Sequence, residues 1–194
     1  MQYFEENKEL KNNTQTIHIN FNNREYKILT NDGIFSKDKL DYGSRLLLET
    51  IIKENITGKV LDLGCGYGII GLVIADNFPK SKVDMVDITD RAIALSQKNT
   101  HSLNNVKVFK SNIYDSITDK YDYIITNPPI RAGKEIIKEF LIGAQSHLTS
   151  DGRLYFVMRK NHGVKTMINI LKKYYEVTIE TRSKGFYIVK CTLK

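Results

Sequence analysis

Asn127-Pro128-Pro129-Ile130 follows a short apolar run at residues 121–126 and carries the clearest chemistry in the sequence. The run predicts a buried strand, and two prolines end it because neither supplies a backbone N–H and both have a locked φ angle. Asn127 is pushed towards an extended conformation by the proline that follows it. The Asn127 side-chain oxygen and the neighbouring carbonyls are then fixed acceptors at a strand end. Such acceptors could orient an amino group that loses a proton, although a plain Pro-Pro strand terminator is the alternative.

A glycine-rich loop, Asp62-Leu-Gly-Cys-Gly-Tyr-Gly68, follows an expected strand at 59–63 and precedes an expected helix at 69–78. Gly66, Gly68 and Gly71 match the G-x-G-x-x-G spacing that lets a backbone approach a nucleotide. Asp87 ends the next expected strand, 21 residues after Gly66. A carboxylate at that place can accept both hydroxyls of an adenosine ribose. Together these features predict a site for a nucleoside-containing cofactor.

Asp62 discriminates between the possible cofactors because it stands directly before the glycines. A pyrophosphate in the loop would be repelled by a carboxylate there, whereas a cationic or zwitterionic amino-acid tail would be attracted. S-adenosylmethionine has such a tail and no phosphate. The sequence therefore favours S-adenosylmethionine over NAD, and a comparison of S-adenosylhomocysteine with NADH binding would separate the two.

Strands and helices alternate through most of the chain, which predicts an α/β fold: a mostly parallel seven-stranded sheet with helices on both faces. A hairpin turning at Asn22-Asn23 precedes this unit, and a second hairpin, with strands 176–181 and 186–191, closes it and adds one antiparallel strand at the edge. We expect residues 1–30 to form an N-terminal extension and 31–194 a single domain. The expected helices are 43–55 with Ser44 as N-cap, 69–78, 89–99, 134–148 and 164–174, and the remaining strands are 59–63, 82–88, 106–110, 121–126 and 153–158.

Composition and charge narrow the class of protein. Apolar residues make up 41% of the chain, and no apolar run approaches the roughly 20 residues that a membrane span needs. Cys65 and Cys191 lack the spacing of a metal site or disulfide framework, so we expect no metal and a cytoplasmic location. The net charge is +7, and residues 131–194 carry 13 bases and 5 acids. This excess predicts a polyanionic partner, nucleic acid first, with a solvated lysine-rich surface as the alternative.

The ordered motifs are similar to those of class I S-adenosylmethionine-dependent methyltransferases. Asn-Pro-Pro is typical of the members that methylate planar amino nitrogens on bases or glutamine amides. Further segments resemble the methyltransferase small domain family, which includes RsmC-type guanine-N2 methyltransferases of small-subunit ribosomal RNA. These segments are residues 32–36, 41–44, 127–134, 152–160 and 184–187, and the resemblance spans roughly residues 25–192.

The resemblance implies a Rossmann-like methyltransferase fold and a set of site residues. Catalysis would fall to Asn127, Pro128 and Pro129. Within the cofactor site, residues 64–67 would line the methionine end, residues 87–88 would hold the ribose and flank the adenine, and residue 112, usually Asp in the family, would contact the adenine. The implied cofactor-binding residues are Phe35, Ser44, Asp62, Gly64, Cys65, Gly66, Tyr67, Asp87, Ile88, Asn112, Ile113 and Asn127.

Substrate contacts are expected at loops that follow parallel strands, because those loops gather around one crevice. Many Asn-Pro-Pro enzymes carry an aromatic residue where Ile130 stands, so base stacking must come from elsewhere or be replaced by apolar contact. Phe186 and Tyr187 are interpreted as core or sheet residues. The expected substrate-binding residues are Ile130, Arg131, Lys134, Arg159 and Lys160.

The expected partner is ribosomal RNA or the small ribosomal subunit, and the expected state is a monomer or weak dimer. Three alternatives stay open at this point: methylation of adenine in nucleic acid, methylation of protein glutamine, and an RNA-binding module without catalysis.

Overall fold

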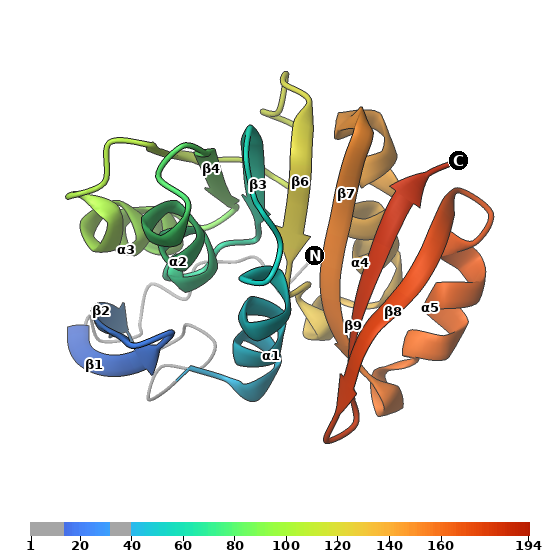
Figure 1. The fold of residues 1–194 in the computed structure, drawn as a ribbon, viewed down its shortest axis with the longest axis horizontal. Helices are drawn as coiled ribbons and strands as arrows, with labels where there is room; N and C mark the ends of the chain where they lie inside the picture. Colours follow the sequence, from blue (N-terminus) through green and yellow to red (C-terminus); the bar gives the residue numbers. More distant parts are fainter. Residues whose placement is uncertain (1–13, 32–39) are drawn as a thin grey trace.

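The computed structural model of the protein describes residues 14–31 and 40–194. A seven-stranded sheet runs through the molecule in the order β5-β4-β3-β6-β7-β9-β8 (Figure 1). Its strands are β3 (Lys59–Leu63), β4 (Lys82–Asp87), β5 (Val106–Lys110), β6 (Tyr121–Thr126), β7 (Leu148–Arg159), β8 (Tyr175–Ser183) and β9 (Phe186–Leu193). The mostly parallel seven-stranded sheet predicted from the sequence is confirmed.

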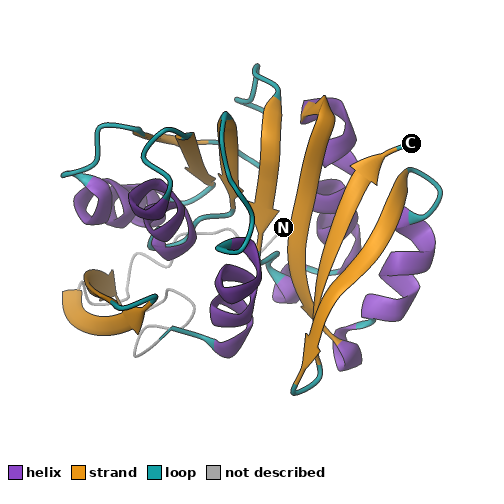
Figure 2. Cartoon of the chain, in the orientation of Figure 1, coloured by secondary structure: helices purple, strands orange, loops and turns teal. Residues whose placement is uncertain are grey.

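Helices cover both faces of this sheet (Figure 2). The helices α1 (Tyr42–Ile51), α2 (Ile69–Asn77) and α3 (Asp90–Thr100) pack into one apolar core, and α4 (Lys134–Gly143) and α5 (Val164–Leu171) pack into a second. Because β3 and β6 are covered on both faces, their residues form nearly continuous buried runs, as parallel strands require. None of the described helices is long and apolar enough to cross a membrane.

The strand order places the predicted motifs at one point of the sheet. The chain runs from β3 outwards through β4 and β5, and then returns to β6 on the other side of β3. The change of direction between β3 and β6 is the point where open α/β sheets bind ligands, at the carboxyl ends of the strands. The glycine loop after β3 and the Asn-Pro-Pro segment after β6 both leave the sheet there.

The closing hairpin differs in one respect from the expectation. Its antiparallel strand β9 lies inside the sheet, between β7 and β8, and the edge strand is β8. Ile188 and Val189 point to opposite faces of β9 and are both 0% exposed, as in a central strand with both faces covered, whereas β8 has the more exposed pattern of an edge strand. The turn at Lys184-Gly185 has left-handed backbone angles (φ 46° and 80°), which is the geometry of a two-residue hairpin.

The predicted N-terminal hairpin is confirmed as β1 (Thr14–Phe21) and β2 (Arg24–Asn31). Its turn residues Asn22 and Asn23 have φ angles of 49° and 58°, which Asn tolerates better than most residues. The hairpin contributes apolar side chains to the core under α2, and the Asn99 side chain on α3 bonds both backbone groups of Leu29 at 2.8 and 2.9 Å. The division of the chain at residue 30 stays a prediction.

Several element boundaries differ from those expected: α1 ends at Ile51 where we expected 55, and α5 ends at Leu171 where we expected 174. Asp41, and not Ser44, caps α1, because its Oδ1 accepts the Ser44 N–H at 3.0 Å. Strand β7 begins at Leu148 where we expected 153, and the preceding helix α4 ends at Gly143 and passes into a 3-10 turn over Ala144–His147. The corrected cap of α1 matters for the site, because it leaves the Ser44 hydroxyl available for another contact.

Candidate active site

Asp62 lies near the end of β3 with a side chain that is 0% exposed. Its Oδ2 accepts the backbone N–H of Gly71 at 2.8 Å, and its Oδ1 has no hydrogen-bond partner in the described part of the chain. Burial raises the pKa of this carboxyl to about 7, against the opposing effect of the Gly71 hydrogen bond. A buried polar atom without a partner is costly. A cationic ligand group would satisfy Oδ1 and favour the ionised form.

The glycine loop after β3 is anchored by hydrogen bonds to β4 and α3 on one side and is open on the other. The Gly64 N–H donates to the Val86 carbonyl at 2.9 Å. Gly66 is held at both backbone groups: its N–H donates to Asp87 Oδ2 at 3.0 Å, and its carbonyl accepts from Ser96 Oγ at 2.9 Å. A Cβ added at Gly66 would meet nothing within 4 Å. The loop is therefore a preformed backbone cradle with room for a ligand on its outer side.

Cys65 and Tyr67, expected to line the methionine end of the cofactor, direct their side chains into the core. They are only 8% and 5% exposed, and burial raises the pKa of the Cys65 thiol well above its usual range. The thiol therefore stays protonated and is a poor nucleophile. The Tyr67 carbonyl accepts from Asn99 Nδ2 at 2.7 Å. Any lining role of these two residues would fall to their backbone.

Gly68 and Gly71 allow α2 to approach β4 closely. Gly68 begins α2 with a φ of 89°, and a Cβ there would lie 2.7 Å from Met85 Cε and 2.8 Å from Ser96 Oγ. A Cβ at Gly71 would lie 2.6 Å from Met85 Sδ. Two glycines of the G-x-G-x-x-G pattern thus serve close packing, and Gly66 alone faces open space.

Asp87 and Ile88 lie at the end of β4 and are half-buried. Besides holding Gly66, Asp87 accepts the Thr89 N–H at 3.0 Å and the Thr89 hydroxyl at 3.2 Å, both through Oδ1. These bonds fix the carboxylate beside the glycine loop. Oδ2 keeps one further acceptor site, so the expected ribose contact is compatible with the geometry and stays a prediction.

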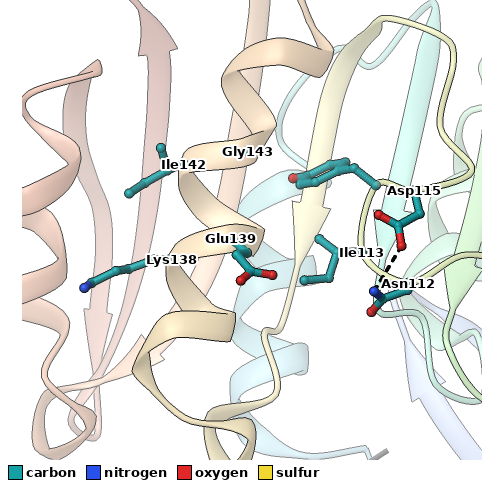
Figure 3. Close-up of a pocket in the computed structure, with 8 residues that line it drawn as sticks. Asn112, Ile113, Asp115, Lys138, Glu139, Ile142 and Gly143 are labelled. Carbon is teal, nitrogen blue, oxygen red and sulfur yellow. Dashed lines mark hydrogen bonds between the residues drawn. The ribbon is translucent and has the colours of Figure 1, made fainter. Parts of the chain in front are cut away.

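Asn112 and Ile113 line a cleft of about 440 Å³ between the segment after β5 and helix α4 (Figure 3). Asn112 Nδ2 donates to Asp115 Oδ2 at 3.1 Å. Ile113 has a φ of 50°, which is unusual for a β-branched residue and is held in part by Ser111 Oγ, which donates to the Ile113 carbonyl at 2.9 Å. Strained backbone of this kind often marks a ligand site. The opposite wall, which sequence reasoning missed because α4 carries no motif, consists of Lys138, Glu139, Ile142 and Gly143.

Asn127 stands beside the glycine loop. Asp62 lies opposite Ile125 in the parallel pairing of β3 with β6, and Thr126 Oγ1 donates to the Leu63 carbonyl at 2.7 Å. Asn127 therefore leaves the sheet at the level of Gly64. Its Nδ2 donates to Ser44 Oγ at 3.0 Å, which brings together two predicted site residues from distant parts of the chain. Pro128 is buried, and Pro129 is half-buried.

The predicted substrate-binding cations lie after two neighbouring parallel strands. Arg131 and Lys134 follow β6, Arg159 ends β7 and Lys160 follows it, and all four are exposed. Because β6 and β7 are adjacent and parallel, these cations lie near one another at the carboxyl ends of the strands. Ile130 begins a 3-10 turn over Ile130–Ala132 and is half-buried.

Two further observations bear on the predicted residues. Phe35 lies outside the described residues. Among residues 14–31 and 40–194, no group of three or more His, Cys, Asp or Glu side chains could hold a metal ion.

Sequence reasoning missed Ser96 and Asn99, two polar residues on the inner face of α3 that hold the glycine loop. Their three-residue spacing on one helix face was the available signal.

Comparison with known proteins places this geometry in a family. The methyltransferase small domain matches residues 25–190. The uncharacterized protein YbxB of Bacillus subtilis is 35% identical over 193 residues, which cover 97% of this chain and 96% of that protein. The Ribosomal RNA small subunit methyltransferase C of Psychromonas ingrahamii is 33% identical over 186 residues, which cover 93% of this chain and 52% of that protein. This chain thus spans about half the length of the relatives named as ribosomal RNA small subunit methyltransferase C.

A solved structure shows the same fold. The 16S rRNA N2 G1207 methyltransferase (RsmC) of T. thermophilus, in complex with AdoMet and guanosine, superposes with a TM-score of 0.81 at 23% identity. The superposition covers 93% of this chain and 51% of that one. This chain therefore belongs to the methyltransferase small domain family of S-adenosylmethionine-dependent methyltransferases.

Proposed function

We propose that this protein methylates an exocyclic amino group, and that the target is guanine N2 of small-subunit ribosomal RNA. The observation that carries the proposal is the side chain of Asn127, held beside the glycine loop by its hydrogen bond to Ser44. This bond fixes the orientation of the amide through its nitrogen, and the amide oxygen can act as an acceptor. The relatives named as small-subunit rRNA methyltransferases, and the similar fold solved with guanosine, support guanine as the base.

The residues around the glycine loop fit S-adenosylmethionine. The unpartnered Asp62 Oδ1 would take the amino group of the methionine end, and the open backbone at Gly66 would lie against the ligand. Asp87 would accept the ribose hydroxyls, and the cleft at Asn112 and Ile113 would take the adenine. The Asp62 carboxylate, directly before the glycines, would repel a pyrophosphate. When bound, the cofactor supplies a methyl group already activated on a sulfonium.

The chain's own contribution is to orient the target nitrogen. Asn127 Oδ1 and a proline carbonyl would accept the two N–H groups of the planar amino group. The Pro129 carbonyl already accepts the Ala132 N–H at 3.0 Å, so we assign this role to the Pro128 carbonyl. Most of the rate would come from this positioning and from exclusion of water. No strong base is needed, because the amino group becomes acidic only after methylation and then loses its proton to water.

The exposed cations after β6 and β7 support an RNA substrate over a protein. Four phosphate contacts, one from each of Arg131, Lys134, Arg159 and Lys160, would give a slope of about −3 for the logarithm of affinity against that of salt concentration. A flat salt response would count against RNA.

The test is transfer of a labelled methyl group to small ribosomal subunits, and to naked 16S rRNA, from a strain that lacks the gene. We expect label in RNA at guanine N2, and no label with Asn127→Ala, although this variant still binds S-adenosylhomocysteine. Asn104→Ala, at an exposed asparagine on the opposite edge of the sheet, is the matched control and should keep full activity.

The other outcomes select the alternatives. Label in adenine would identify adenine, and not guanine, as the target base. Label in a protein glutamine would identify a protein, and not RNA, as the substrate. Cofactor binding without any transfer would support an RNA-binding module, and near-normal activity of Asn127→Ala would refute the mechanism.

A further inference from the structure

An aromatic and basic cluster lies where α1 meets the turn between β8 and β9. The rings of Tyr42 and Phe186 have centroids 5.5 Å apart and planes inclined by 50°. The Arg159 guanidinium lies 4.8 Å from the centroid of Phe186, and the Lys184 ammonium lies 4.8 Å from that of Tyr42. The cations are exposed and the rings are half-buried. We call these four residues the hairpin platform.

The strand register puts the hairpin platform on the same face of the sheet as Asn127. Alternate residues of β6, β7 and β9 pack into the core under α1, namely Tyr123, Ile125, Tyr155, Val157 and Ile188. Because side chains alternate along a strand, Asn127, Arg159 and Phe186 fall on this face as well. Phe186 lies two strands away from Asn127 and two residues further along the sheet, which is roughly 12 Å at the usual strand spacings.

A short path through the start of α1 joins the hairpin platform to Asn127. A Cβ at Gly43 would lie 2.9 Å from Phe186 Cε1, so the Phe186 ring rests directly on the backbone of α1. The residue before Gly43 is Tyr42, and the residue after it is Ser44, whose hydroxyl accepts from Asn127. Three consecutive residues therefore connect the rings to the side chain that would hold the target base.

We propose that the hairpin platform is a stacking site for an unpaired nucleobase that neighbours the target nucleotide, an inference that rests on the proposed function. Unpaired RNA bases stack on aromatic rings and on guanidinium planes, and cations beside them neutralise the phosphates. The platform offers both kinds of surface, with Arg159 stacked on Phe186.

The absence of tryptophan from the chain permits a direct test. Phe186→Trp introduces a single tryptophan into the platform, and titration with a short unstructured oligoribonucleotide should quench its fluorescence. Tyr187→Trp is the matched control, because the adjacent Tyr187 packs into the core on the opposite face of β9, with Arg182 5.1 Å from its ring centroid. The control should show no quenching. Heparin, a polyanion without bases, should quench neither variant.

Affinity gives the second readout. Phe186→Leu should weaken oligoribonucleotide binding roughly 5- to 100-fold and raise the KM for RNA, with S-adenosylhomocysteine affinity unchanged. Tyr187→Leu should leave RNA binding within about twofold of the wild type.

Equal quenching in both tryptophan variants, quenching by heparin, or normal RNA affinity in Phe186→Leu would overturn the platform. If Phe186→Leu does not fold, the tryptophan pair decides. Normal RNA methylation by a Phe186→Leu variant with unchanged KM would overturn the platform and leave the proposed function standing. The proposed function falls if the wild type transfers no methyl group to guanine N2 of RNA.

Discussion

The buried carboxyl of Asp62 predicts a pH dependence of cofactor binding. Its pKa is raised to about 7, mainly by burial, and one of its oxygens lacks a partner among the described residues. We expect the ionised form to bind the amino group of the cofactor. Binding should therefore strengthen as the pH rises towards 7, and it should be accompanied by release of a proton.

The magnitude follows from the pKa. With a pKa of about 7, roughly 1% of the Asp62 carboxyl is ionised at pH 5 and about half at pH 7. If only the ionised form binds, affinity rises about fiftyfold over this range. A free α-amino group has an ordinary pKa of about 7.7–8.0, so the ligand stays cationic throughout.

The assay is isothermal titration calorimetry with S-adenosylhomocysteine, in paired buffers that differ in ionisation enthalpy and so report the proton release. Asp62→Asn should bind weakly at every pH and without the rise. Asp87→Asn removes another carboxylate at the loop and should keep the rise, with a slightly lower midpoint, because the charge of Asp87 helps to raise the pKa of Asp62. A flat profile in the wild type, or the same rise in Asp62→Asn, would show that ionisation of Asp62 does not control cofactor binding.

Three further predictions concern the same region. The ligand-free protein should lose stability as the pH rises from about 4 to about 7. The reason is that Asp62 keeps its proton up to about pH 7 in the folded protein, whereas in the unfolded chain the carboxyl releases it near pH 3.8. Thermal unfolding should show this fall in the wild type and not in Asp62→Asn. Ser44→Ala should lower single-turnover methylation about five- to tenfold, the value of one hydrogen bond, without loss of RNA affinity. Gly68→Ala should cost about 1–3 kcal/mol of stability in denaturant unfolding, given its φ of 89° and close neighbours, whereas Gly66→Ala, with open space around it, should cost less and mainly weaken cofactor binding.

Local patterns predicted much of the fold and part of the site. The glycine loop and the strand-ending Asp87 stand at spacings that a strand, loop and helix fix by themselves. The Asn22-Asn23 hairpin could be predicted for the same reason, since its turn geometry depends on two residues.

Contacts between distant segments could not be predicted from the sequence. The hydrogen bond between Asn127 and Ser44 joins residues 83 positions apart, and it depends on how α1 packs over β6. The interior position of β9 depends on the burial of Ile188 and Val189 on both faces, which competes with the usual tendency of a closing hairpin to extend the edge. The left-handed backbone of Ile113 contradicts the local preference of a β-branched residue, so no propensity could have indicated it.

Asn127 is proposed to direct methylation of guanine N2 in small-subunit ribosomal RNA. The most direct measurement is nucleoside mass spectrometry of that RNA from a strain lacking the gene, complemented with the wild type or with Asn127→Ala at equal protein levels. We expect N2-methylguanosine to decrease in the deletion strain, to return with the wild type and not to return with Asn127→Ala. Unchanged N2-methylguanosine in the deletion strain, or equal restoration by the two proteins, would contradict it.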